Sequence, residues 1–108
     1  RERRATMSDK QSPSELQAEV DRQIEVIRQR MDEIDARLVA LLNERANCAK
    51  DIGDLKDQVG MEVYQPNREI EVLAHVRSEN RGPLNGEAIT RLFELIIDEA
   101  RRLERTPK

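Results

Sequence analysis

The chain has 108 residues, of which 38% are charged and 2% aromatic, and its formal net charge at pH 7 is −3. Acidic and basic residues are interspersed, which excludes the basic field that binds nucleic acid and the polybasic patch that binds membranes. One cysteine and one histidine exclude an intrachain disulfide and a conventional zinc site, and no apolar run is long enough for a membrane span or a signal peptide. We therefore expect one cytoplasmic, all-helical domain with an aliphatic core, which oligomerisation would enlarge.

The N-terminal residues 1–12 are polar and lack periodicity, which predicts a disordered tail. A typical helix start follows, with Ser12 as N-cap, Pro13 at the first helical position and Glu15 closing a capping box. We therefore expect the helical domain to occupy residues 13–108.

A long amphipathic helix is predicted over residues 20–59, which contain no proline. Its apolar residues recur at alternating steps of three and four, as one face of a helix requires. They are Val20, Ile24, Ile27, Met31, Ile34, Leu38, Leu41, Cys48, Ile52, Leu55 and Val59. Forty helical residues span roughly 60 Å, whereas a compact domain of this size is only about 34 Å across. The alternatives are a coiled-coil rod and a helix covered by a second copy, and we expect an intertwined homodimer.

Two shorter helices are predicted after Gly60, a natural residue to end the first one. The second helix starts with Pro66 at its first position and ends at the breaker sequence 80–83, and Asn85 caps the third. Their apolar faces comprise Ile70, Leu73 and Val76, then Ile89, Leu92, Phe93, Ile96, Ala100 and Leu103. The expected fold class is all-α, with one very long, one short and one medium helix.

Several charged residues occupy unusual positions. Arg45 occupies a position on the apolar face of the long helix where the pattern predicts an apolar residue. Lys56 follows on nearly the same face three turns later. Arg68 and Glu69 lie in the first turn of the second helix and can fold back over that face. Glu104 extends an apolar flank of the third helix, so we expect it to be partly buried and able to donate a hydrogen bond as the neutral acid.

Together these positions indicate a pocket for a small dicarboxylate, because Arg offers each carboxylate a bidentate pair of donors and Lys a point charge. The alternative is that each charge is solvated or paired on a coiled-coil surface. Arg28 precedes Arg45 by 17 residues, roughly 25 Å along the helix. It could reach the same small ligand only from the partner chain of an antiparallel dimer.

Several short motifs follow one another in a fixed order. They are residues 27–35 at the opening of the long helix, Leu-Leu-x-x-Arg at 41–45, Gly-x-x-Lys at 53–56, Pro-x-Arg-Glu at 66–69, and Gly-Pro-Leu at 82–84 followed by 89–97. In this register the chain resembles the all-helical class of chorismate mutases over residues 27–104. The Gly-Pro-Leu turn is similar to that of mutase domains fused ahead of prephenate dehydratase.

The resemblance implies a homodimeric enzyme that converts chorismate to prephenate by a Claisen rearrangement, without metal or cofactor. Arg45 and Arg28 of the partner subunit would bind the two carboxylates of the substrate. Lys56 would donate to the ether oxygen and a carboxylate. Glu104 falls where the family places Gln or Glu against the ether oxygen.

The resemblance also implies four secondary contacts with the substrate or its surroundings. Glu69 would accept a hydrogen bond from the ring hydroxyl, and Arg68 would support the far wall. Gln65 falls where many members have Asp, and Ala100 where some have Ser, so these two positions depart from the family pattern.

Two other functions remain open at this point. An isochorismate-pyruvate lyase resembles the same class and acts on a sister substrate. A non-catalytic helical dimerisation module is the second alternative, and it predicts that Arg45 is exposed and replaceable.

Overall fold

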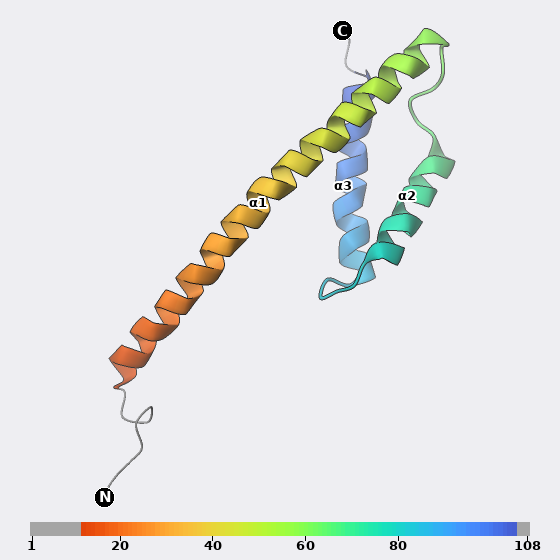
Figure 1. The fold of residues 1–108 in the computed structure, drawn as a ribbon. Helices are drawn as coiled ribbons and strands as arrows, with labels where there is room; N and C mark the ends of the chain where they lie inside the picture. Colours follow the sequence, from red (N-terminus) through yellow and green to blue (C-terminus); the bar gives the residue numbers. More distant parts are fainter. Residues whose placement is uncertain (1–11, 106–108) are drawn as a thin grey trace, which may run out of the picture. The chain divides into compact units, whose positions relative to one another are not determined.

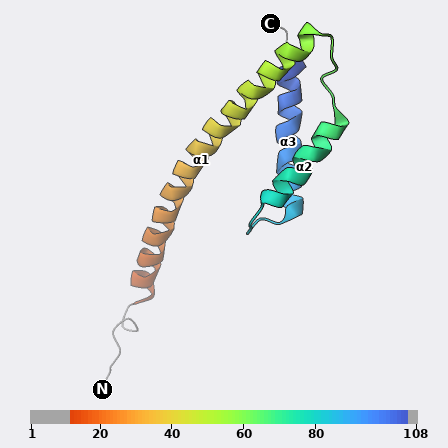
Figure 2. The ribbon, with the colours of Figure 1, turned by 45° about the vertical axis from the view of Figure 1, so that its right-hand side comes forward.

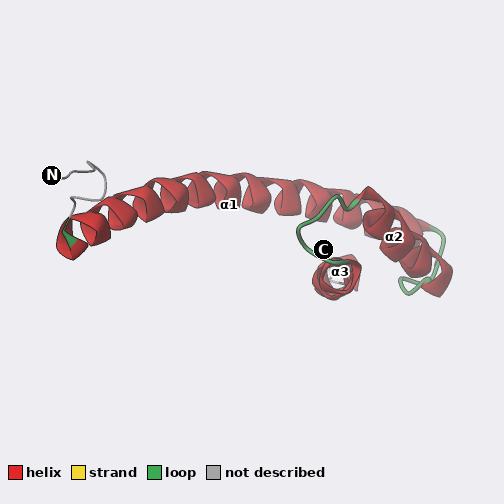
Figure 3. Ribbon diagram, turned by 90° about the horizontal axis from the view of Figure 1, so that it is seen from below, coloured by secondary structure: helices red, strands yellow, loops and turns green. Residues whose placement is uncertain are grey.

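The structure is a computed structural model that describes residues 12–105. Three helices follow one another, α1 (Pro13–Gln58), α2 (Pro66–Glu79) and α3 (Gly86–Arg105) (Figure 1). Residues 12–105 contain no strand (Figure 3), so the prediction of an all-α fold with one very long, one short and one medium helix is confirmed. Apart from Ser12, the predicted disordered tail lies outside the described residues.

The chain forms two compact units, residues 1–39 and residues 40–108. Of the described residues, 13–39 of α1 belong to the first unit, and the rest of α1 belongs to the second with α2 and α3. No helix in the described part of the chain is both long and apolar enough to cross a membrane.

The start of α1 is fixed by the capping box that the sequence predicts. The backbone N–H of Ser12 donates to Oε1 of Glu15 at 2.8 Å, and the backbone N–H of Glu15 donates to Oγ of Ser12 at 3.1 Å. Hydrogen bonds to the carboxyl of Glu15 from the backbone of Ser12 first, and then from its side chain, hold the pKa of Glu15 below its ordinary value. The predicted helix start at Pro13 is therefore confirmed.

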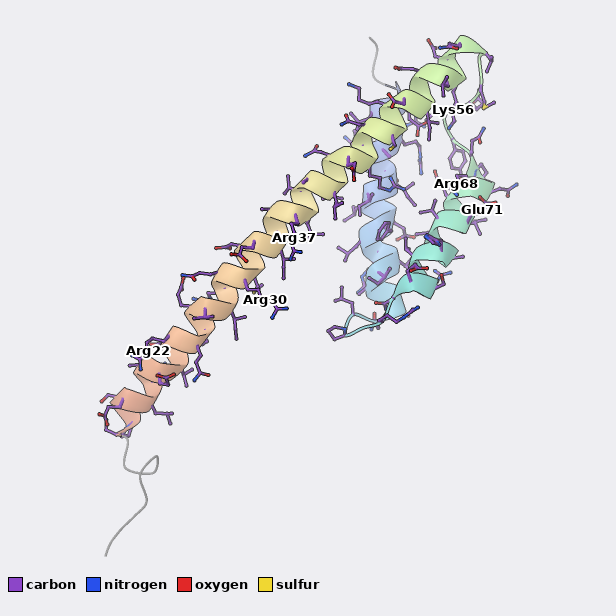
Figure 4. All side chains as sticks on the ribbon, in the orientation of Figure 1. Arg22, Arg30, Arg37, Lys56, Arg68 and Glu71 are labelled. Atoms are coloured by element: carbon purple, nitrogen blue, oxygen red, sulfur yellow. The ribbon has the colours of Figure 1, made fainter. Side chains whose placement is uncertain are left out.

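The N-terminal unit carries an apolar stripe that is exposed. Among residues 13–39 none is buried, and Figure 4 marks Arg22, Arg30 and Arg37 along the same stretch. The stripe comprises Val20, Ile24, Ile27, Met31, Ile34 and Leu38, whose exposed fractions run from 37% to 58%. A contiguous apolar face of this kind on a protein surface marks an interaction site.

The end of α1 is a Schellman motif. Gly60 adopts φ +68°, its N–H donates to the carbonyl of Asp57 at 3.3 Å, and the N–H of Met61 donates to the carbonyl of Lys56 at 2.9 Å. The prediction that Gly60 ends the helix is confirmed, and the last helical residue is Gln58. This turn places residue 63 close enough to α1 to contact Lys56.

Helices α2 and α3 lie side by side and run in opposite directions (Figures 1 and 2). Pro66 stands at the start of α2 as predicted, and the side chain of Asn85 caps α3 by accepting from the N–H of Ala88 at 2.8 Å. Between the helices, Asn80 stabilises the turn, because Oδ1 accepts from the N–H of Gly82 and Nδ2 donates to the carbonyl of Leu84.

The buried core of the C-terminal unit is small, with Ala49, Gly53 and Ile97 as its buried residues in the described range. The sequence pattern of α3 points to Ile96 and Leu92 as core positions. The structure instead buries Ile97 and leaves Leu92 49% exposed. Ile97 lines a cavity to which α1, α2 and α3 all contribute.

Candidate active site

The C-terminal unit contains a cavity of about 250 Å³, open to solvent on part of its surface. The last turns of α1, the segment before α2, the first turns of α2 and the C-terminal half of α3 all contribute to it. Its walls comprise Arg45, Cys48, Ala49, Ile52, Lys56, Val63, Gln65, Arg68, Glu69, Val72, Ile97, Ala100, Arg101 and Glu104.

Seven of the eight residues predicted from the sequence line this one cavity. They are Arg45, Lys56, Gln65, Arg68, Glu69, Ala100 and Glu104. Arg28, the eighth residue, belongs to the N-terminal unit and is exposed there. Residues that are far apart in sequence, five of them chosen for their charge and Gln65 and Ala100 for the family resemblance, therefore line one small cavity.

Lys56 and Glu104 form the best-buried polar pair of the cavity. Nζ of Lys56 donates to Oε1 of Glu104 at 3.0 Å and to the backbone carbonyl of Val63 at 3.1 Å. The two side chains are only 14% and 13% exposed, which confirms that Glu104 is partly buried. An ammonium has three N–H bonds, so one remains for a ligand. The ammonium can donate to a carboxyl in either protonation state, so the neutral form of Glu104 remains a prediction.

Arg101 is a lining residue that the sequence analysis missed. Its Nη2 lies 2.8 Å from Oε2 of Glu69, and its guanidinium carbon lies 5.0 Å from the centre of the Tyr64 ring. The side chains of Arg101 and Glu69 are each 25% exposed. The available signal was its spacing, because Arg101 precedes Glu104 by three residues and so shares its side of α3.

The two remaining cations of the walls are held less tightly. Arg45 is half-buried, so the apolar face of α1 is interrupted by a charge that the cavity accommodates. Arg68 lines the cavity, but its guanidinium pairs with Glu71 at 3.5 Å on the surface of α2 (Figure 4). Because its side chain is 70% exposed, Arg68 is free to change rotamer.

The charge of the cavity is opposite to that of the chain. Four basic and two acidic side chains line it, a net charge of +2 with all six ionised, whereas the whole chain carries −3. Apart from Cys48 and Gln65, the remaining lining residues are aliphatic, and low-dielectric walls strengthen the field of the cations. The cavity is slightly smaller than the roughly 300 Å³ of the smallest common ligand pockets. The arrangement therefore suits one small anion with two negative groups.

Comparison with known proteins points to a single family. The family model for chorismate mutase type II matches residues 27–105. The bifunctional chorismate mutase/prephenate dehydratase of Pseudomonas aeruginosa is 38% identical over 91 residues, a match covering 80% of this chain and 25% of that protein. The chain thus spans about a quarter of the length of this relative.

Solved structures of the same kind share the fold. A chorismate mutase from Thermus thermophilus (form II) matches with a TM-score of 0.76 and 34% identity, covering 80% of this chain and 99% of that one. The chorismate mutase of Helicobacter pylori, solved in complex with prephenate, matches with a TM-score of 0.69 and 28% identity, covering 75% of this chain and 88% of that one. The matched family range includes all of α2 and α3, much of α1 and every residue that lines the cavity. The chain therefore belongs to the chorismate mutase type II family.

Proposed function

We propose that the chain catalyses the Claisen rearrangement of chorismate to prephenate, in the biosynthesis of phenylalanine and tyrosine. The observation that carries this proposal is the convergence of Arg45, Lys56 and Glu104 on one cationic cavity. The Helicobacter pylori neighbour, whose structure contains prephenate, adds support from the comparisons.

Binding follows from the charges. Chorismate is a dianion with two carboxylates, and Arg45 would form a bidentate contact with one of them. Arg68 can turn from Glu71 towards the cavity and strengthen the far wall. The other two arginines that line the cavity, Arg68 and Arg101, pair with Glu71 and Glu69. We assign the contact with the second carboxylate to Arg28 of the partner subunit.

The rearrangement requires that the substrate be oriented and that developing charge be stabilised, and it requires no nucleophile. In the rearrangement one C–O bond breaks, one C–C bond forms, and the ether oxygen becomes partly negative in the transition state. The remaining N–H of Lys56 and a protonated Glu104 would donate to that oxygen, and preorganised donors of this kind lower the barrier without reorganising. The aliphatic walls would hold the compact conformer in which the reacting carbons meet.

Three further residues would complete the substrate contacts. Glu69 would accept the hydrogen bond of the ring hydroxyl through Oε1, since Oε2 faces Arg101. Gln65 and Ala100 also line the cavity, and they would make weaker contacts. No metal or cofactor takes part in this proposal.

We also infer an intertwined homodimer and a helical domain over residues 13–108, in a cytoplasmic protein. The exposed apolar stripe of residues 20–38 supports the dimer, because a second copy of the same helix would cover it. In this assembly the cavity would be incomplete without Arg28 of the partner subunit.

The decisive experiment follows the loss of chorismate absorbance on addition of purified protein, with Arg45→Ala beside wild type. Conversion by wild type and its loss in the variant would support the mutase. Mixing inactive Arg28→Ala with inactive Arg45→Ala then tests the shared site, because each heterodimer carries one intact cavity.

The alternatives give different outcomes. A folded dimer that ignores chorismate but releases pyruvate from isochorismate would be a lyase. One that acts on neither substrate, and whose melting temperature a dicarboxylate transition-state mimic leaves unchanged, would be a dimerisation module.

A further inference from the structure

Arg101 is held by three groups, one on α2, one on α3 and one in the segment before α2. Its Nη2 lies 2.8 Å from Glu69 of α2 and 3.4 Å from Asp98 of its own helix, and its guanidinium lies over the ring of Tyr64. Its Nε is buried and has no hydrogen-bond partner among the described residues. An unsatisfied buried donor is costly, so the position of the guanidinium is dictated by its other contacts.

The contact with Glu69 matters because of what the cavity binds. An uncompensated carboxylate in the wall would repel a dianionic substrate. The repulsion is stronger in a partly enclosed cavity than in water, because the dielectric constant there is lower. The guanidinium of Arg101 neutralises Glu69 on the Oε2 side. Oε1 of Glu69 has no ion pair or hydrogen bond among the described residues, so it is available as an acceptor.

We propose that Arg101 is a positioning residue for the reaction, which neutralises and orients Glu69 so that Oε1 can accept from the substrate hydroxyl without repelling the substrate carboxylates. This inference rests on the proposed mutase activity. Tyr64 also contacts the guanidinium through a cation–π interaction, with 5.0 Å between the guanidinium carbon and the centre of the ring. The segment before α2 thereby contributes to the alignment of a residue on α2.

The competing explanation is that Arg101 simply ties α3 to α2. The two explanations differ in which kinetic constant changes. A purely structural tie, once lost, lowers the folded fraction and so lowers kcat per total protein, while the molecules that remain folded keep their KM. A positioning role changes KM in the folded enzyme, because the dianion then meets an uncompensated carboxylate.

The test combines Arg101→Met, Glu69→Gln and the double variant Arg101→Met/Glu69→Gln in the full chain. Arg101→Met should raise KM for chorismate about tenfold or more, as loss of a close charge partner does. In the Glu69→Gln background the same change should raise KM less than about threefold, because no carboxylate is left to compensate. Arg101→Lys should recover part of the loss, since an ammonium keeps the charge without the fork of donors.

Arg102→Met is the matched control. Arg102 is the neighbouring arginine of α3, its side chain is 76% exposed, and it pairs with Glu99 at 3.7 Å away from the cavity. This variant should keep both kinetic constants.

Fluorescence gives a readout that is independent of turnover. Tyr64 is the only tyrosine, and the chain has no tryptophan, so its emission reports on this site alone. Removal of the guanidinium should change the Tyr64 emission in Arg101→Met and leave it unchanged in Arg102→Met.

Each outcome decides the matter. An inactive wild type would overturn the proposed function and this inference with it. An active wild type whose KM rises equally on Arg101→Met in both backgrounds, or does not rise at all, would overturn the inference alone. If Arg101→Met fails to fold, the KM of Arg101→Lys decides. A KM that Arg101→Lys raises when Glu69 is present, and raises less in the Glu69→Gln background, supports the inference. A KM that Arg101→Lys leaves unchanged overturns it.

Discussion

A Cβ atom placed on Gly53 of α1 would lie 2.9 Å from Cα of Glu104 in α3. Real Cβ contacts essentially never come so close, and here the neighbouring atom is backbone, which cannot swing away. The backbones of the two helices therefore touch at this point. Lys56 follows Gly53 by three residues, on the same side of α1, so this contact is what brings its ammonium within 3.0 Å of the Glu104 carboxyl.

Gly53→Ala should consequently damage both stability and activity. Alanine is the better helix former by about 1 kcal/mol, but forcing a methyl group against a backbone costs about 1–3 kcal/mol. We expect a net loss of up to about 2 kcal/mol in the free energy of unfolding, measured by urea denaturation. We also expect kcat for chorismate to fall about tenfold or more, because Glu104 and Lys56 move apart.

Gly86→Ala is the control for that substitution. A Cβ on Gly86 would meet only Cδ of Arg77, at 3.6 Å, which is ordinary van der Waals contact. It should keep the stability and activity of wild type. Equal behaviour of the two alanine variants would contradict the close contact between α1 and α3.

Local sequence signals predicted the helices well, because their causes are local. Ser12, Gly60 and Asn85 act on backbone groups within four residues, and the structure confirms each of these helix ends. The chemistry of Lys56 and Glu104 was visible, yet their contact across 48 residues depends on packing that no short pattern encodes.

Two features of the site required the three-dimensional structure. Gly53 stood out only as part of a motif, since the need for glycine there comes from a helix 51 residues later in the chain. Arg101 was missed because its partners, Tyr64 and Glu69, belong to other segments. Arg28 is the reverse case, a residue chosen from the sequence whose role requires a second subunit to test.

The capping box at Ser12 makes a prediction about pH. The pKa of Glu15 is lowered from its ordinary value of 4.5, because the Ser12 backbone and side chain donate to its ionised form. A lowered pKa means that the capping box stabilises the helix start above that ordinary value. The contribution is lost as the pH falls through the lowered pKa.

Ser12→Ala should bring the pKa of Glu15 back up, because it removes the side-chain hydrogen bond and loosens the cap. Ser12→Thr, which keeps a hydroxyl, should retain the low value. An NMR titration of the Glu15 side chain measures this directly. Identical titration curves for the alanine variant and wild type would show that the cap does not form in solution.

The exposed stripe of α1 predicts the oligomeric state. Met31 lies in the middle of the stripe and is 54% exposed. Met31→Asp would place a carboxylate in the proposed dimer interface, where an unpaired charge is costly. We expect the dissociation constant to rise about a hundredfold or more, a penalty of about 3 kcal/mol, with loss of the dimer in sedimentation velocity at micromolar protein.

Gln29→Asp introduces the same charge on the opposite face of the same helix. It should remain a dimer, so a comparison of the two variants separates loss of the interface from a general effect of charge. Wild type that sediments as a monomer would remove the basis for a site shared between subunits.

Glu104→Gln tests the proton that the proposed mechanism places on this side chain. A neutral carboxyl donates a hydrogen bond to the ether oxygen, whereas a carboxylate repels the negative charge that develops there, so wild-type activity should fall as the pH rises.

The amide of glutamine donates at every pH. We therefore expect the variant to retain activity and to lose the alkaline decline, measured as kcat/KM from pH 4 to 9. The difference between the two profiles isolates Glu104, because the two proteins differ at this side chain alone. A wild-type profile that is flat over the whole range would assign the hydrogen bond to Lys56 alone and leave Glu104 as the acceptor that holds the ammonium in place.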